Sequence, residues 1–410
     1  MVRTMPLVKF GLLICLFFVI IGFIASNVVI MQIGKEDNIQ HVNRAVDSAV
    51  TVKLFSSPET ENAINPTVPG APCVEIGVIA EQGNWTIEET CPRINCTVKT
   101  KQTLEYSEIS ETDAVYFQKL SSSISEWKQY MRQRKSGHIW IFVTYESPRN
   151  TPHLALPRLY KDAFNWDVTY RTDSTFVSPY GRYLRYGTET HDTIEADGNI
   201  LPELKKNGTL EATVMWMSSN CFATSWPRTK FVRLLSEYIK IDTYGRCGRN
   251  NCPRGPECEN IIKKYKFYLS FENSECADYI TEKFWDPLSH NVIPVVYGPP
   301  REDYEKVAPP NSFIHVQDFR NFSDLANYLK RVDQNVTLFN QYFQWKKTGY
   351  LEANAMARNF DPKLVFCRVA EKILNWKKTG KGRVGTLDLR KSWGTSCEDK
   401  NILGNMLGKY

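Results

Sequence analysis

The sequence predicts an α/β fold in which two parallel-sheet units follow an N-terminal membrane anchor. Strand and helix patterns alternate along residues 113–316, which is typical of parallel sheets with crossover helices. The strands are short continuous apolar runs, as expected for sheets covered on both faces. A polar stretch at 200–212, broken by Gly and Pro, separates two such series.

The predicted elements lie on both sides of this break. Upstream, residues 113–137 are predicted to be helical, and HIWIFVTY at 138–145 predicts a buried strand. Two downstream segments predict helices, at 228–240 and 277–285. Further segments predict strands, at 213–219, 241–245, 265–272, 291–298 and 313–316. Open sheets of this kind bind ligands beyond the carboxyl ends of their strands.

The N-terminus carries the predicted anchor. Residues 10–33 contain no charge and can cross a bilayer, which takes about 20 apolar residues. Basic residues before this run favour a cytosolic tail over residues 1–9 and a lumenal body. The small residues Ala25 and Ser26 would suit a cleaved signal peptide instead, but the apolar stretch of a signal usually has only ~7–15 residues.

The chain after the anchor divides into four parts. Residues 34–72 are polar and proline-containing and predict a flexible stem. The predicted domains span 73–205 and 206–365, and residues 366–410 form a C-terminal segment.

Cysteine usage agrees with a lumenal body. The chain has eleven cysteines, and the ten after the anchor could form up to five disulfides in an oxidising compartment. The net charge of +6 is too small to favour nucleic acid as a partner. N-x-S/T sequons mark candidate glycosylation sites at Asn84, Asn95, Asn207, Asn321 and Asn335.

The stretch FENSECADYITEK at 271–283 follows a predicted strand and ends in charged residues. A helix that begins near Asp278 would point its N-terminal amides towards an anion. Lys283 could meet a phosphate, and the Glu282 carboxylate could accept hydrogen bonds from sugar hydroxyls. The stretch therefore suits a phosphate-linked sugar, although an exposed helix turn with solvated charges would show the same pattern.

Two further residues stand at strand ends. Arg228 follows Pro227 in the first turn of a predicted helix, where it could grip a pyrophosphate bidentately. Glu146 ends the 138–145 run, and a partly buried carboxylate there could take a proton from a hydroxyl. A surface arginine and an ordinary strand-end glutamate are the alternatives.

Together these segments resemble the α1,3/4-fucosyltransferases, glycosyltransferase family 10. The residues YKFYLSFENSECADYITEKFWDPLSHNVIPVVYG at 265–298 look like the donor-binding signature of that family. RCGRNNCPRGPEC at 246–258 is similar to the invertebrate core-type branch. Other matches keep the family's order: FVTYESP, FNWDVTYRTDSTFVSPYG, VMWMSSNC, IDTYGRCG, PPNSFIHVQDF and YFQWKK.

The resemblance implies an inverting enzyme of the GT-B fold, with two Rossmann-like domains facing across a cleft, that uses GDP-β-L-fucose. Glu146 would be the general base on the acceptor hydroxyl, and Arg228 and Lys283 would neutralise the diphosphate. Glu282 would hold hydroxyls of fucose or ribose. Three residues would line the nucleotide and its sugar: Tyr268, Asn273 and Tyr279.

The family also implies a single-pass type II protein of the Golgi membrane that acts on glycoprotein N-glycans. The acceptor would be N-acetylglucosamine of the glycan core, with antennal N-acetyllactosamine as the alternative. A membrane-anchored glycan-binding protein without turnover would fit the same features. The acceptor-side domain would be the first one, and the second would bind GDP-fucose.

Neither a metal nor another cofactor is expected to be obligatory. The chain contains no Asp-x-Asp pair, and two cations could meet the diphosphate in place of Mn²⁺. The closely spaced Cys247, Cys252 and Cys258 favour disulfides over zinc in a lumenal setting. A Cys221–Cys276 bridge is expected to join the two donor loops.

Overall fold

The computed structural model of the chain describes most of the body. The described residues are 73–80, 84–120, 123–151, 160, 162–187, 213–253, 255–352, 362–380, 384–389 and 393–397. The predicted tail, anchor, stem and polar break, and the sequon at Asn207, lie outside these residues. Within the described ranges, no helix combines the length and apolar character that a membrane crossing requires.

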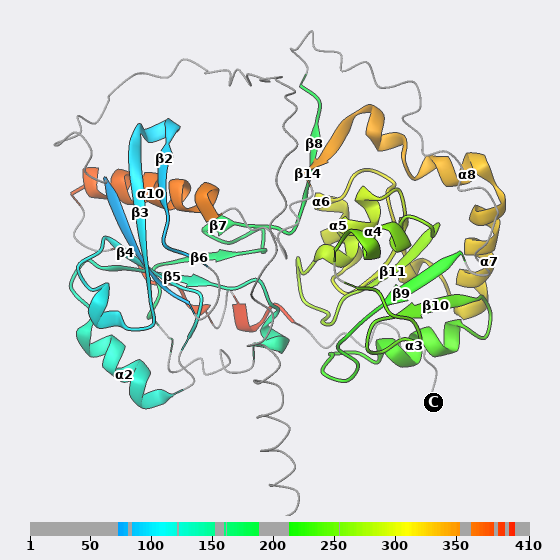
Figure 1. Cartoon of the computed structure of the whole chain (residues 1–410), viewed down its shortest axis with the longest axis horizontal. Helices are drawn as coiled ribbons and strands as arrows, with labels where there is room; N and C mark the ends of the chain where they lie inside the picture. The colour runs from blue at the N-terminus through cyan, green and yellow to red at the C-terminus, as the bar shows by residue number, and fades with distance from the viewer. Residues whose placement is uncertain are drawn as a thin grey trace, which may run out of the picture. The chain divides into compact units, whose positions relative to one another are not determined.

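The first sheet has the strand order β2-β3-β1-β4-β5-β6-β7 (Figure 1). All neighbouring pairs are parallel except β2 and β3, which form an antiparallel pair. The strands are β1 Val74–Ile79, β2 Glu88–Cys91, β3 Cys96–Thr103, β4 Ala114–Phe117, β5 Ile139–Val143, β6 Trp166–Thr169 and β7 Phe176–Val177.

The predicted helix over 113–137 is partly wrong. Its first part is strand β4, whose four residues are all buried between β1 and β5. Helix α2 covers only Ile124–Gln133 and begins where the Ser123 hydroxyl accepts a hydrogen bond from the Glu126 amide. The apolar sequence AVYF fits a central strand, since both faces of the sheet are covered at this position. The strand predicted at 138–145 is confirmed as β5.

A distant part of the chain covers the first sheet. Helix α10, Pro362–Lys378, lies against strands β1, β2 and β3 (Figure 1). Five of its residues join the apolar cluster of this sheet: Val365, Phe366, Val369, Ala370 and Ile373. A disulfide between Cys91 and Cys367 links the end of β2 to this helix. The core of the first sheet is therefore completed by residues almost 300 positions along the chain.

The second sheet has the order β10-β9-β11-β12-β13, and all its pairs are parallel. Its strands are β9 Val214–Met217, β10 Ile241–Tyr244, β11 Phe267–Phe271, β12 Ile293–Tyr297 and β13 Ile314–His315. The helices of this part are α3 Arg228–Leu235, α4 Pro256–Ile262, α5 Glu282–Ser289, α6 Arg301–Val307, α7 Phe322–Gln334 and α8 Val336–Gln341. Two largely parallel sheets with helices between their strands confirm the predicted α/β class.

Smaller elements complete the described part. Strands β8 Arg182–Arg185 and β14 Gly349–Glu352 form an antiparallel pair. Short 3-10 helices are η2 Pro92–Ile94, η3 Tyr106–Glu108, η4 Pro148–Asn150, η6 Val316–Asp318 and η7 Gln344–Lys347. All five strands predicted downstream of the polar break are confirmed, whereas the helix predicted at 228–240 ends earlier, at Leu235.

Helix α5 begins later than predicted. Asp278 has a φ of 60°, in the left-handed region, so no right-handed helix can run through it. Thr281 is extended and caps the helix, because its hydroxyl accepts a hydrogen bond from the Lys283 amide. The prediction of a helix from Asp278 is therefore wrong, and Glu282 is its first residue.

Ten of the eleven cysteines form five disulfides. The pairs are Cys73–Cys96, Cys91–Cys367, Cys221–Cys247, Cys252–Cys258 and Cys276–Cys397. The expected Cys221–Cys276 bridge is therefore wrong. Strand β9 lies between β10 and β11, so the loop after β9 has two neighbouring loops, and Cys221 bonds to the one after β10.

Candidate active site

The carboxyl ends of the central strands of the second sheet bring polar residues together. Ser218 follows β9, Glu272 follows β11 and Gly298 follows β12. Since parallel strands present their carboxyl ends at one edge, the loops after them share that edge. The sequence-predicted cluster 271–283 lies there, between β11 and α5.

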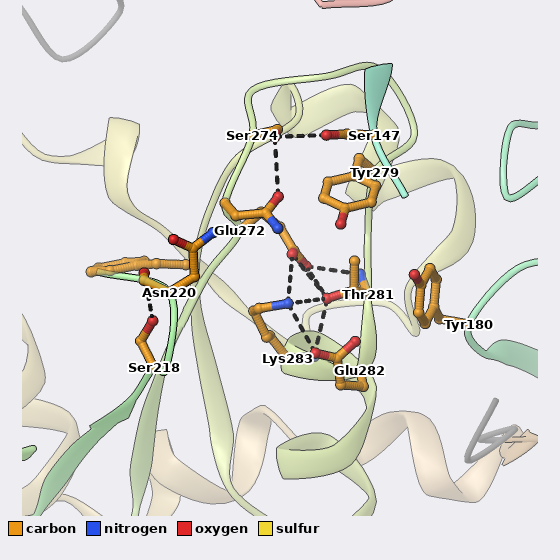
Figure 2. Close-up of polar contacts among 12 residues, drawn as sticks. Ser147, Tyr180, Ser218, Asn220, Glu272, Ser274, Tyr279, Thr281, Glu282 and Lys283 are labelled. Atoms are coloured by element: carbon orange, nitrogen blue, oxygen red, sulfur yellow. Dashed lines mark hydrogen bonds and ion pairs between the residues drawn. The ribbon is translucent and has the colours of Figure 1, made fainter. Parts of the chain in front are cut away.

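Lys283 lies at the centre of this cluster (Figure 2). Its ammonium donates to the Thr281 hydroxyl and to Glu282 Oε1, both at 2.9 Å. The carboxylate of Glu272 lies 3.4 Å from the same nitrogen. Burial would lower the pKa of Lys283, but the charges of the two glutamates outweigh it and raise the pKa. Lys283 therefore stays charged at neutral pH.

Glu282 and Lys283 remain accessible. Their side chains keep 35% and 20% of their surface exposed. Burial opposes ionisation of Glu282, but the charge and hydrogen bond of Lys283 outweigh this effect and lower its pKa. An ionised carboxylate beside an ammonium can accept hydrogen bonds from hydroxyls while its neighbour meets an anion.

Arg228 is held more tightly than expected. It is 2% exposed, and its guanidinium donates to Phe271 O, to the Ser218 hydroxyl and to Asn220 O at 2.8–2.9 Å. Nη2 uses both of its protons in two of these bonds. While these bonds are present, the two terminal nitrogens cannot bind a pyrophosphate bidentately as predicted. The buried Nε has no hydrogen-bond partner. Burial lowers the pKa of Arg228, against the opposing charge of Glu272.

Tyr268 and Asn273 lie at different ends of β11: Tyr268 is the second residue of the strand, and Asn273 lies two residues beyond its carboxyl end. Tyr268 is buried in an apolar cluster with Met215 and Cys258, and burial raises its pKa against the opposing charge of Lys283. Asn273 is half-buried, and its side-chain oxygen accepts a hydrogen bond from Ser274 at 3.0 Å. The Asn273 side chain is the more accessible of the two.

Glu146 meets the donor-signature stretch directly. Tyr279 OH donates to Glu146 Oε2 at 2.9 Å, and Asn150 Nδ2 approaches the same oxygen at 3.4 Å. Both contacts fall on Oε2, which leaves Oε1 for another partner. Glu146 is exposed, so the partial burial predicted for it is wrong. The following residue, Ser147, donates to the Ser274 hydroxyl at 2.7 Å (Figure 2).

The tyrosine that contacts Glu146 is firmly packed. Tyr279 is 1% exposed, and its ring lies 5.0 Å from that of Tyr170. Trp393 also packs against Tyr170, with ring centroids 5.5 Å apart. The disulfide Cys276–Cys397 holds the same C-terminal segment against the loop. Asp278, beside Tyr279, accepts two bonds from Thr172, through the amide and the hydroxyl.

Sequence reasoning missed the residues that hold the site together. Glu272 is fully buried, accepts hydrogen bonds from Thr281 and pairs with Lys283. Its position directly after the apolar run FYLSF was a signal, since a carboxylate there must lie at the sheet edge. Tyr180 lies beside the cluster (Figure 2) and donates to Tyr145 O. Trp393 carried no such signal, because it lies far along the chain.

Four of the predicted glycosylation sites can be placed. Asn84, Asn95, Asn321 and Asn335 are all exposed. Asn321 and Asn335 also cap helices α7 and α8, with side-chain oxygens that accept from the Asp324 and Leu338 amides. Their exposure is compatible with modification.

Two cavities lie away from this cluster. They measure about 650 and 560 Å³ and share Arg301, Asn311 and Phe313 in their linings. None of the predicted donor or base residues lines either cavity. Within the described ranges, no three His, Cys, Asp or Glu side chains gather as metal ligands would.

Comparisons with known proteins identify the family. The family model described as "Glycosyltransferase family 10 (fucosyltransferase) C-term" matches residues 207–387, and the one described as "Fucosyltransferase, N-terminal" matches residues 75–181. Among solved structures, a crystal structure of an α1,3-fucosyltransferase is similar with a TM-score of 0.48 and 18% identity, over 80% of this chain and 95% of that one.

Curated relatives carry consistent names. The glycoprotein 3-alpha-L-fucosyltransferase A of Drosophila melanogaster is 37% identical over 64% of this chain and 48% of its own length. The alpha-(1,3)-fucosyltransferase 4 of Bos taurus is 35% identical over 60% of this chain and 59% of its own. The human 4-galactosyl-N-acetylglucosaminide 3-alpha-L-fucosyltransferase FUT5 is 36% identical over 64% and 63%. The chain thus spans less than two thirds of each of these relatives. Because two family models match its two sheets in order, the chain belongs to glycosyltransferase family 10, the fucosyltransferases.

Proposed function

We propose that the chain is an inverting α1,3-fucosyltransferase that moves L-fucose from GDP-β-L-fucose to the 3-hydroxyl of N-acetylglucosamine in glycoprotein glycans. The hydrogen bond from Tyr279 to Glu146 carries this proposal. It joins the candidate base on the loop after β5 to the donor-signature stretch before α5. A base and an anion-binding lysine within one connected site are what a transfer from a nucleotide sugar requires.

The reaction is a single displacement. Glu146 Oε1 takes the proton of the acceptor 3-hydroxyl as the oxygen attacks C1 of fucose. The bond between C1 and the diphosphate oxygen breaks, and its electron pair leaves with GDP. Attack on the face opposite the leaving group converts the β-linked donor into an α-fucoside.

The cations and polar groups of the second sheet serve the donor. Lys283 meets the diphosphate and stabilises the negative charge that grows on GDP. Arg228 adds a second positive charge near the diphosphate, and its unpartnered Nε can donate a hydrogen bond. Glu282 accepts hydrogen bonds from hydroxyls of fucose or ribose, and Tyr268, Asn273 and Tyr279 line the nucleotide and sugar. With two cations in this role, no divalent metal or other cofactor is obligatory.

The acceptor proposed for this chain is N-acetylglucosamine of the N-glycan core. The similarity to a relative named glycoprotein 3-alpha-L-fucosyltransferase A and the segment RCGRNNCPRGPEC support this choice. Other relatives are named for 4-galactosyl-N-acetylglucosaminide, which makes antennal N-acetyllactosamine the competing acceptor.

The proposed setting is the Golgi membrane, with a single type II span and a lumenal body. The uncharged run 10–33 and the basic residues before it support this topology. Five disulfides fit an oxidising compartment.

The test uses the purified full-length chain with GDP-fucose, EDTA and a panel of defined N-glycans, and mass spectrometry to locate any added deoxyhexose. Fucose on the inner core is expected. Fucose on an antenna would replace the core acceptor with the antennal one. Activity that appears only after Mn²⁺ is added would contradict the metal-independent mechanism. GDP binding without transfer under any condition would leave a glycan-binding protein in place of the enzyme.

A further inference from the structure

We propose that Glu272 is a positioning residue of the donor site, whose buried carboxylate fixes Thr281 and Lys283 in the arrangement that meets the diphosphate. The inference rests on the proposed function, because it assigns a role within the same site. Glu272 is not assigned a contact with the donor. It acts through Lys283.

The contacts of Glu272 leave it one arrangement. Its Oε1 accepts from the Thr281 amide at 2.8 Å and lies 2.9 Å from the Thr281 hydroxyl. Its Oε2 lies 2.9 Å from the same hydroxyl and 3.4 Å from the Lys283 ammonium. The side chain is 0% exposed, so no water competes for these positions. Breaking a buried charged pair leaves the remaining charge without compensation.

The direction of the hydrogen bonds links Lys283 to Glu272 through Thr281. An ammonium only donates, so the Thr281 hydroxyl accepts from Lys283 at 2.9 Å. The hydroxyl then gives its single proton to Glu272. Thr281 also caps helix α5. The end of β11 is thereby tied to the start of α5, which carries Lys283.

The two glutamates around Lys283 are not equivalent. Lys283 has three protons and three oxygen neighbours: the Thr281 hydroxyl, Glu282 and Glu272. An arriving phosphate must therefore replace one of them. Glu282 is 35% exposed and can turn away, whereas Glu272 is enclosed. The donor displaces Glu282, which is then free to bind sugar hydroxyls, and Glu272 keeps the lysine in place.

The neighbouring strand makes room for Glu272. A side chain at Gly298, directly after β12, would place its Cβ 2.7 Å from Glu272 Cβ and 2.9 Å from its Cγ. Real Cβ atoms essentially never approach so closely, so a residue larger than glycine at 298 would push the carboxylate out of position. Three elements thus build the pocket that encloses Glu272.

The sign of a mutational effect separates positioning from simple charge. If Glu272 acted only as a negative charge, removing that charge would favour a diphosphate and tighten GDP binding. If it positions Lys283, Glu272→Gln should weaken GDP binding. The glutamine side chain can accept the Thr281 bonds through its oxygen only if its NH2 group points at the Lys283 ammonium, which cannot accept a hydrogen bond. We expect about a tenfold loss of GDP affinity, or about 1.4 kcal/mol.

The experiment measures GDP binding to the full-length chain by calorimetry, with Asp333→Asn as the matched control. Asp333 pairs with Lys266 at 2.7 Å at the start of β11, whereas Glu272 lies at the other end of the same strand. The control should lose stability and keep its GDP affinity. The KM for GDP-fucose should rise with the GDP dissociation constant in Glu272→Gln, and kcat should change less. Unchanged or tighter GDP binding in Glu272→Gln would overturn the proposal.

A second pair of variants covers the case in which Glu272→Gln does not fold. Thr281→Val removes the hydroxyl that joins Lys283 to Glu272, and Thr281→Ser keeps it. Thr281→Val should lose about fivefold more GDP affinity than Thr281→Ser, and equal affinities would overturn the proposed link.

Acetylation of Lys283, followed by mass spectrometry, separates this inference from the proposed function. In Glu272→Gln and Thr281→Val, where Lys283 has lost a partner, it should react several-fold faster than in the chain without substitutions, whether or not GDP binds. If the chain without substitutions bound no GDP, the proposed function would be wrong. The labelling rates would still test whether Glu272 positions Lys283. Unchanged labelling in both Glu272→Gln and Thr281→Val would reject that role by itself.

Discussion

The two sheets differ in how the chain assembles them. The second is built from strands β9 to β13, which follow one another within residues 214–315, and all its pairs are parallel. The first includes an antiparallel edge strand and depends on helix α10, from residues 362–378, for its apolar cover. The second sheet is therefore local in sequence, whereas the first needs a distant segment before its core is closed.

The two sheets also differ in what they bring to the site. The elements and loops of the second carry six of the seven predicted catalytic and substrate-binding residues, and the loop after β5 in the first carries only Glu146. This division suggests that donor binding belongs to one unit and proton abstraction to the other. Variants on either side should then separate binding from turnover.

Glu146→Gln should give the largest effect and the clearest separation. Loss of the general base is expected to lower kcat by about 10³-fold, within the usual range for such groups. GDP affinity should stay nearly intact, because the proposed donor contacts lie on the other unit. Transfer rates and GDP calorimetry check both points. Glu88→Gln, an exposed glutamate on strand β2, is the control. Loss of GDP binding as well would show that Glu146 has a structural role.

The distant closure of the first sheet predicts the next effect, on stability. Replacing both Cys91 and Cys367 by serine opens a link over 276 residues, and up to about 5.6 kcal/mol of unfolding free energy should be lost. The matched pair Cys252→Ser and Cys258→Ser opens a link over only 6 residues and should cost about 2 kcal/mol. Denaturant titration of the two variants measures the difference. Equal losses would mean that α10 packing alone closes the first sheet.

The same contrast explains how much of the fold could be predicted. Strands β5, β11 and β12 are continuous apolar runs, so their patterns sufficed. Strand β4 looked helical because AVYF joins a helical pattern without a turn signal. Nothing in 74–103 predicted the three strands there, since charged residues such as Lys99 interrupt the pattern.

The site was predictable to the extent that its residues stand at strand ends. Glu146 was singled out in this way, and the structure joins it to the donor-signature stretch, which contains Lys283. The late start of α5 was missed, because Asp278 takes a left-handed conformation that an aspartate only occasionally adopts. The disulfide of Cys276 to Cys397 depends on a chain path that spacing does not encode.

Lys283→Ala should produce the next effect, on the donor side alone. Losing the charge that is proposed to face the diphosphate is expected to weaken GDP and GDP-fucose binding about 30-fold, or about 2 kcal/mol. Acceptor affinity should hardly change, because Glu146 is left in place. Lys263→Ala, at the exposed end of α4, serves as the control. Donor affinity that stayed the same would remove the phosphate role from Lys283.

The smallest expected effect is one that both sheets should share. His138 precedes β5 and His315 lies in β13, and burial lowers the pKa of each to about 4. An unfolded histidine has a pKa near 6.5, so the unfolded chain takes up protons first as the pH falls. Stability is therefore fully present above pH 6.5 and is lost as the pH falls towards 4.

Between pH 7.5 and 5.5 each histidine should account for about 1 kcal/mol of this loss. Denaturant titrations of His138→Gln and His315→Gln at the two pH values should each show a smaller acid effect than the parent chain. Hydrogen exchange can assign the loss to each sheet. If only His138→Gln reduced the acid effect, the first sheet, which depends on a distant helix, would be the one that limits stability. If both did so equally, the two sheets would respond to acid alike despite their different assembly.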